Sequence, residues 1–211
     1  MECWTRRTLS QGLVFLAATR KKTLTADEWR EQLEPFDSWN RRLILAVFAL
    51  LGIPPSYLDI GSGTGAMSSV ARSLGIDALG VDMIARKPDK YYDLNGPMKL
   101  GRTFELVTCI EVAEHIPMVH TKILCGNIAR HVADNGLLVF TAAGPGQAGD
   151  GHINLKLASE WRTLFWDRRL HYREDLTHKL KLAWQILPSP AIWLPGNVQI
   201  FNKIPVEGHE A

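Results

Sequence analysis

The sequence predicts a doubly wound α/β fold, in which helices cover both faces of a mostly parallel β-sheet. The first observation is the stretch 57–66, YLDIGSGTGA, where apolar residues run into a glycine-rich turn and then into a helix-forming segment. The second is the alternation of short apolar runs with helical patterns along the chain, which is typical of strand–helix–strand units. The third is a hydrophobic content of 46%, which is enough for a full core.

Two helices are expected before the first strand. Thr25 can cap a helix that ends near Leu33, since the residue before Pro35 avoids helical geometry. Asp37 or Ser38 can cap the second helix, whose apolar residues recur at helical spacing until a glycine and two prolines end it.

Six apolar segments are expected to form strands, at 57–60, 76–81, 104–110, 137–141, 182–187 and 198–201. Lys90, Tyr91 and Tyr92 can form the third strand of the sheet, between the second and the fourth. Further helices are expected at 66–74, 119–133 and 155–167. In the second of these we expect Ile123, Leu124 and Ile128 to point inward and Asn135-Gly136 to mark the end. A glycine-rich loop at 142–154 follows the fifth strand, at the carboxyl edge where open α/β folds bind ligands.

The glycine turn indicates a bound ligand, and the residues around it favour one kind. Gly61, Gly63 and Ala66 satisfy the G-x-G-x-x-G/A pattern of dinucleotide-binding folds, and Asp82 lies about 20 residues further on, where a ribose-binding acid belongs. Asp59, however, precedes the first glycine by two residues, and its charge would repel a pyrophosphate. A carboxylate at that position suits a cationic ligand. A structural turn without a ligand is the alternative.

The run 59–65, DIGSGTG, resembles the first motif of class I S-adenosylmethionine (SAM) methyltransferases. SAM carries a sulfonium and an amino group and no phosphate. The resemblance covers about residues 38–201 and implies a Rossmann-like, seven-stranded, mostly parallel sheet with an antiparallel last strand. It also implies SAM as the cofactor, with Asp82 on the ribose and Asp93-Leu94 at the adenine amine. The implied cofactor-binding residues are Asp59, Gly61, Ser62, Gly63, Gly65, Asp82, Met83, Asp93, Leu94 and Glu111.

Acidic and histidine side chains follow the fourth and fifth predicted strands. They are Glu111, Glu114 and His115 after the fourth strand and His152 after the fifth. One hypothesis makes His115 or His152 the general base toward an acceptor hydroxyl, because an imidazole titrates near neutral pH. Glu114 would then orient or polarise the base.

A second hypothesis is a metal site. The pattern Glu111-x-x-Glu114-His115 resembles the ligand set of ubiquinone-pathway O-methyltransferases and of small-RNA 2′-O-methyltransferases. A helix beginning at Glu111 would place these side chains on one face, and His152 would be a fourth ligand for Mg²⁺, Mn²⁺ or Zn²⁺. The remaining alternative is a structural role for Glu114 and His115, as a helix cap or a hydrogen bond to the sheet.

The predicted function is SAM-dependent transfer of a methyl group to an oxygen of a small molecule or saccharide. A nucleic-acid methyltransferase is one rival; its phosphate contacts would come from the basic residues Arg168, Arg169, Arg173, Lys179 and Lys181. Interleaved acidic residues favour a solvated helix face for that cluster. The other rivals are an NAD(P)-binding oxidoreductase, which Asp59 disfavours, and a non-catalytic SAM-binding module.

The chain is expected to form one methyltransferase domain at 38–204, after a helical extension at 1–37 with a short helix at 9–18, and before a disordered tail at 205–211. The net charge of +2 is too small to indicate nucleic acid by itself. Three cysteines without metal spacing fit a reducing, cytoplasmic setting. No apolar run is long enough to span a membrane. The oligomeric state is left open.

Overall fold

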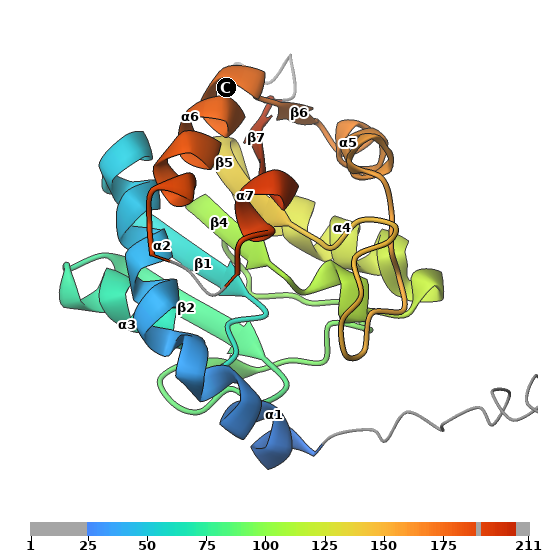
Figure 1. The fold of residues 1–211 in the computed structure, drawn as a ribbon. Helices are drawn as coiled ribbons and strands as arrows, with labels where there is room; N and C mark the ends of the chain where they lie inside the picture. The colour runs from blue at the N-terminus through green and yellow to red at the C-terminus, as the bar shows by residue number, and fades with distance from the viewer. Residues whose placement is uncertain (1–24, 189–190, 206–211) are drawn as a thin grey trace, which may run out of the picture.

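A seven-stranded sheet with helices on both faces forms the centre of the computed structural model, which describes residues 25–188 and 191–205 (Figure 1). The strand order is β3-β2-β1-β4-β5-β7-β6. Strands β1 to β5 pair in parallel, and β7 is antiparallel to both β5 and β6. The predicted α/β fold, with its antiparallel last strand, is confirmed. The helix expected at 9–18 and the tail from 206 onward lie outside the described residues.

The strands are β1 Ser56–Ile60, β2 Asp77–Asp82, β3 Lys90–Tyr91, β4 Phe104–Ile110, β5 Val132–Thr141, β6 Leu170–Tyr172 and β7 Gln199–Lys203. The α-helices are α1 Ala26–Leu33, α2 Asp37–Leu51, α3 Ala66–Ser73, α4 Thr121–His131, α5 Ala158–Trp166, α6 Glu174–Gln185 and α7 Leu194–Asn197. Three 3₁₀ turns are η1 Glu34–Phe36, η2 Ala113–His115 and η3 Met118–His120.

The sheet is buried on both faces because successive strand residues point to opposite sides. On β5, Val139 packs into a cluster with α2, α3 and α6, whereas Leu138 and Phe140 pack into a second cluster with α4 and α5. These helices therefore form two layers around the sheet, and the ligand-binding edge is left to the loops at the carboxyl ends of the strands.

The start of α1 has the predicted capping box. The Thr25 hydroxyl accepts from the Glu28 backbone N–H, and the Glu28 carboxylate accepts from the Thr25 N–H. The predicted cap of α2 is wrong: η1 runs directly into α2, and Phe36 occupies the cap position without a side-chain hydrogen bond. Asp37 instead accepts a hydrogen bond from the hydroxyl of Thr64, on the glycine turn.

The strand predicted at 182–187 is wrong. Helix α6 runs through Gln185, with Leu180 and Trp184 buried at helical spacing while Leu182 is half exposed. The apolar residues at 182–187 follow one another so closely that they show no helical spacing by themselves. The spacing becomes visible only when the residues from Glu174 onward are included. The edge strand is β6, only three residues long, and such a short strand leaves little alternation for a sequence pattern to detect.

The boundary between α4 and β5 also differs from the prediction. The helix ends at His131, and β5 begins at once, so Asn135-Gly136 lies inside the strand rather than at the helix end. Asn135 has a φ of 62°, and the pairing with β4 shifts register nearby, so the two residues make a strand irregularity. On α4, Leu124 and Ile128 are buried as expected, but Ile123 is 36% exposed.

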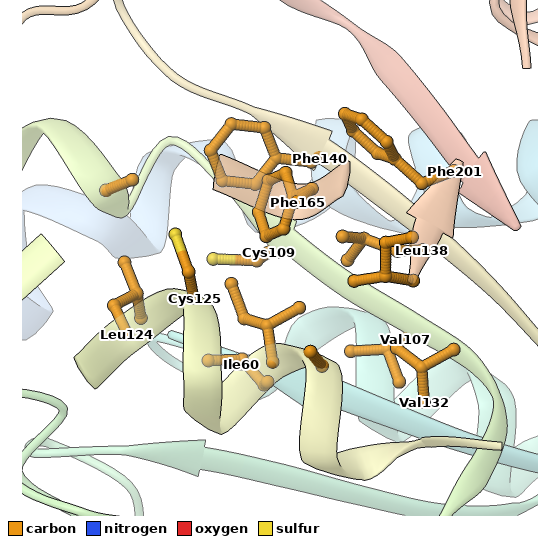
Figure 2. Close-up of a cluster of buried hydrophobic side chains, with 14 of the residues drawn as sticks. Ile60, Val107, Cys109, Leu124, Cys125, Val132, Leu138, Phe140, Phe165 and Phe201 are labelled. Carbon is orange, nitrogen blue, oxygen red and sulfur yellow. The ribbon is translucent and has the colours of Figure 1, made fainter. Parts of the chain in front are cut away.

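Three phenylalanines from different elements anchor the core beneath α5 (Figure 2). The Phe165 ring on α5 lies 5.0 Å from the ring of Phe140 on β5 and 4.9 Å from that of Phe201 on β7, measured between centroids. All three side chains are fully buried. This contact joins α5 to the part of the sheet that carries the antiparallel strand.

Phe165→Ala should lower the free energy of unfolding by about 3–5 kcal/mol, because it removes a buried ring and leaves a cavity between two others. Denaturant unfolding followed by far-UV circular dichroism measures the change. Ile186→Ala is the control: its side chain is 83% exposed, and the expected change is below about 0.5 kcal/mol. A loss below about 1 kcal/mol for Phe165→Ala would contradict this packing.

Candidate active site

The glycine turn after β1 takes a conformation that side chains would block. Gly61, Gly63 and Gly65 have φ values of 76°, 55° and 84°. The N–H of Gly61 donates to the Val81 carbonyl at the end of β2, at 2.8 Å. A Cβ on Gly61 would lie 2.2 Å from a Val112 methyl carbon, so the backbone there is closely covered by the segment after β4. Gly65 is the N-cap of α3.

Asp59 is buried beneath this turn, with 4% of its surface exposed. Its carboxylate accepts a hydrogen bond of 2.7 Å from the hydroxyl of Thr108 on β4, which is in turn 2.6 Å from the Tyr57 hydroxyl. Burial raises the pKa of Asp59 to about 7, and the nearby carboxylates of Asp89 and Asp82 add to the shift. A cation placed beside Asp59 would favour its ionised form.

The Asp82 carboxylate lies at the end of β2 and faces the glycine turn. One oxygen accepts from the Gly63 N–H and the other from the Ile84 N–H, both at 2.9 Å. The loop geometry therefore fixes the acid against the turn. Met83, next to it, is 52% exposed. Ser62 turns the other way, since a Cβ on Gly80 would lie 2.7 Å from its hydroxyl oxygen.

Asp93 and Leu94, expected near an adenine ring, follow the short β3 strand. No helix separates β2 from β3, as their close spacing predicted. The exposed Asp93 carboxylate accepts from the backbone and side-chain amides of Asn95, at 2.9 and 2.8 Å, and so closes a local turn. Leu94 is 7% exposed and packs into the core. Their role toward adenine stays a prediction.

The N-terminal helix lies against the glycine turn and the end of β2. The Arg30 guanidinium donates to the Ile84 carbonyl, and a Leu33 methyl lies 3.1 Å from the Cβ position of Gly63. The indole of Trp29 meets the ring of His115 edge to face, with centroids 5.6 Å apart. α1 therefore contacts both the predicted cofactor turn and the histidine cluster.

Glu114, His115 and His152 converge at the carboxyl edge, with one possible ligand atom from each lying within 4.8 Å of the others. Glu114 is fully buried; one carboxylate oxygen accepts from the Ala143 N–H at 3.2 Å. Burial raises the pKa of Glu114, and the nearby carboxylate of Glu111 adds to the effect. The loops after β4 and β5, which are far apart in sequence, thus form one site.

Backbone contacts hold these two loops together. The Glu114 carbonyl accepts from the N–H groups of Ile153 and Asn154, at 2.8 and 3.1 Å. The buried Asn154 side chain donates to the Ala113 carbonyl at 3.2 Å and to the Thr121 hydroxyl at 2.9 Å. These bonds fix the position of His152, which precedes them by one and two residues.

The hydrogen bond of His152 defines its protonation pattern. Its Nδ1 lies 3.0 Å from the carbonyl oxygen of Gln147. A carbonyl only accepts, so Nδ1 carries the proton and Nε2 keeps its lone pair in the neutral ring. Gly149 allows this arrangement, because a Cβ there would lie 2.3 Å from the imidazole. The site therefore presents a basic nitrogen.

Glu111 does not join this cluster. The expected helix beginning at Glu111 is wrong: the residue has a φ of 53°, and the 3₁₀ turn begins only at Ala113. The Glu111 carboxylate instead accepts from the Trp193 indole N–H at 3.0 Å and from the Asn197 side-chain amide at 3.5 Å. These two partners come from the proline-containing connection before β7, a segment without a periodic pattern of apolar residues.

A family model described as "Methyltransferase domain" matches residues 29–185. The chain therefore belongs to this methyltransferase-domain family, and its fold and glycine turn make it a class I SAM-dependent methyltransferase. No curated protein sequence matches the chain significantly.

Solved structures share the fold at low identity. The sugar N-methyltransferase KedS8 from a Streptoalloteichus species is 14% identical, with a TM-score of 0.60 over 97% of this chain and 99% of that one. NodS, an N-methyltransferase from Bradyrhizobium japonicum bound to S-adenosyl-L-homocysteine (SAH), is 17% identical, with a TM-score of 0.56 over 85% and 93%. A 1,6-didemethyltoxoflavin-N1-methyltransferase from Burkholderia thailandensis, bound to 1,6-didemethyltoxoflavin and SAH, is 14% identical, with a TM-score of 0.56 over 87% and 92%.

The residues around the turn fit SAM. The three glycines take the positive-φ conformations that the turn after β1 requires, and the buried Asp59 carboxylate suits a positively charged ligand. Asp82 is placed against the turn, where an acid can accept the hydroxyls of a ribose. Among residues 25–188 and 191–205, no helix is both long and apolar enough to cross a membrane.

Gly61→Ala should lower stability and weaken SAH binding by at least about tenfold, because the new methyl must displace Val112 and the turn with it. Thermal unfolding and isothermal titration calorimetry with SAH measure the two effects. Gly75→Ala is the matched control: its φ is 79°, but nothing lies near its Cβ position. Equal SAH affinity in the two variants would contradict the proposed cradle. A second substitution, Val112→Ala, should partly restore binding to Gly61→Ala.

Proposed function

We propose that the protein transfers the methyl group of SAM to a hydroxyl oxygen of a small molecule or saccharide. The observation that carries this proposal is the convergence of Glu114, His115 and His152 beside the glycine turn, with the lone pair of His152 Nε2 available to a proton. An amine nitrogen is the alternative acceptor atom, since the structurally similar KedS8 is, by name, a sugar N-methyltransferase.

SAM supplies an electrophilic methyl group whose leaving group is a neutral thioether. The chain's own residues must bind it, orient the acceptor and take the acceptor proton. We assign binding to the predicted cofactor residues: Asp59, the glycine turn with Ser62, Asp82, Met83, Asp93, Leu94 and Glu111. Asp59 would balance the positive charge of the bound cofactor.

His152 would take the acceptor proton at Nε2. Its Nδ1–H bond to the Gln147 carbonyl holds the ring in the correct tautomer and orientation. The buried Glu114 carboxyl lies within 4.8 Å of a ring nitrogen of His152 and would orient or polarise the base. His115, between Trp29 and the His152 ring, would position the base.

A divalent metal at the same cluster is the alternative mechanism. One carboxylate and two imidazoles would suit Mn²⁺ or Zn²⁺ better than Mg²⁺, which prefers oxygen ligands. The ion would lower the pKa of a bound hydroxyl. The hydrogen bond at Nδ1 leaves a lone pair on Nε2 that would serve a proton or a metal ion equally, so the two mechanisms need the chelation experiment to separate them.

A nucleic-acid acceptor is less well supported. Arg168 donates to the Leu164 carbonyl at 2.6 Å, Arg169 to the Ile204 carbonyl at 2.8 Å, and Arg173 pairs with Asp175 at 2.8 Å. These guanidinium groups are engaged within the chain rather than aligned for phosphates. We also infer a reducing, cytoplasmic setting, which the free thiols of Cys109 and Cys125 would fit.

SAM affinity should rise with pH up to about 7, the pKa of Asp59, and then level off. The protonated carboxyl cannot balance a cation, so binding requires proton release, and the dissociation constant should increase by up to tenfold per unit below that pKa. Calorimetry between about pH 5.5 and 7 avoids titration of the SAM amino group, whose pKa lies near 8. Asp59→Asn should bind weakly and without this pH dependence; a wild-type affinity independent of pH would contradict the role of Asp59.

His152→Ala should reduce the rate of methyl transfer by about 10²–10⁴-fold, the usual contribution of a general base, and leave SAM affinity unchanged. The rate is measured as SAH production from a hydroxyl acceptor. Equal loss of SAM binding would contradict the division of roles between Asp59 and His152.

The same assay separates the base from the metal. Activity that survives dialysis against a chelator supports His152 as the base. Activity that is lost with chelation and restored by Mn²⁺ or Zn²⁺ supports the alternative mechanism.

A further inference from the structure

A strained backbone position lies at the end of β4. Glu111 has a φ of 53°, a left-handed conformation that residues other than glycine rarely adopt. Its N–H donates to the Thr141 hydroxyl at 2.9 Å, and this bond ties the end of β4 to the end of β5. The Glu111 carboxylate reaches Trp193 and Asn197 while it stays close to Glu114. Strain of this kind is often retained at functional sites.

The carboxylate of Glu111 meets the connection between α6 and β7. Trp193 and Asn197 donate to different oxygens of the carboxylate, at 3.0 and 3.5 Å. β7 begins at Gln199, paired with Phe140 near the carboxyl end of β5, so this connection arrives at the same edge of the sheet. In Figure 1, α7 lies near the ends of β4 and β5.

Both groups retain binding capacity. A carboxylate has about four acceptor positions; on Glu111 two of them serve Trp193 and Asn197, and the neighbouring Glu114 carboxyl takes one more, so capacity remains. Trp193 is 45% exposed although its N–H is fixed, so part of a large and oriented ring is open to solvent. An oriented aromatic surface beside a few fixed polar groups is how small-molecule sites combine affinity with specificity.

We propose that Glu111 and Trp193 recognise the methyl acceptor, and that the acceptor is a neutral, polyhydroxylated saturated ring. The carboxylate accepts hydrogen bonds from ring hydroxyls, while the indole packs against the ring C–H groups. Asn197 holds the carboxylate in place. This inference rests on the proposed function, and it assigns acceptor specificity to a connection outside the β4 and β5 loops.

The test uses the SAH-saturated protein and three probes: methyl glucoside, methyl glucosaminide and catechol. Saturation-transfer difference NMR should show magnetisation reaching the ring C–H protons of methyl glucoside in the wild type. In Trp193→Ala and in Glu111→Gln, the dissociation constant for this probe should increase by about tenfold, the size expected for one lost anchoring contact. Trp193→Phe keeps a ring but loses the N–H, and its affinity should be intermediate.

Two control variants match the tested residues in type. Trp166→Ala removes a tryptophan that is 61% exposed. Its ring stacks on that of His171 in β6, the outermost strand on one side of the sheet. Glu105→Gln changes an exposed glutamate at the other end of β4. Neither control should change probe affinity. Calorimetry should show the same SAH affinity in both Trp193 variants and in both controls.

Each other outcome overturns the inference. No saturation of methyl glucoside, or equal probe affinity in Trp193→Ala and Trp166→Ala, removes the recognition role. Preferential binding of catechol or methyl glucosaminide replaces the neutral saccharide with an aromatic or amine acceptor. Methyl transfer to a hydroxyl acceptor that is unaffected by Trp193→Ala defeats this inference alone, whereas a wild type that fails to bind SAH defeats the proposed function.

Discussion

The buried carboxylate of Asp59 is the constraint on which the site depends. Taking an ionised carboxylate out of water is costly unless a positive charge or strong donors face it. Here the neutral hydroxyl of Thr108 faces it, and the pKa rises to about 7. The free protein therefore holds a group whose charge is only partly compensated at neutral pH. A cationic cofactor above the glycine turn would supply the missing positive charge. Binding would then be favourable in part because it removes the electrostatic cost of the buried carboxylate.

The other features of the edge follow from where the strands end. Parallel strands bring the segments after β1, β2, β4 and β5 to one side, and the glycines allow Val112 to lie directly over the turn. Glu111 and Glu114 then take different partners because the backbone is left-handed at the first and forms a 3₁₀ turn at the second. One carboxylate meets Trp193, and the other meets His152. Glu111 and Glu114 are three residues apart in the sequence, yet their carboxylates have different neighbours.

Much of this arrangement could be predicted from the sequence. The strand–turn–helix around Gly61 and the buried run at Phe104 are local patterns, and they placed the edge correctly. The convergence of Glu114 with His152 could be predicted because the two residues follow adjacent strands. The contact of Thr108 with Asp59 could not be predicted, because it depends on strand register. The contact of Trp193 with Glu111 could not be predicted either, because it depends on a backbone conformation that no local pattern encodes. The helix α6 was missed because its apolar residues crowd both faces near its end.

The most direct test of this account is the pKa of Asp59, measured by NMR titration of its side-chain carboxyl carbon with and without SAM. The account predicts a pKa near 7 in the free protein and a shift to lower pH of at least about one unit when SAM binds, since the cation favours the ionised form. A free-protein value near 4, or a value that SAM leaves unchanged, would contradict the claim that this carboxylate balances the charge of the cofactor.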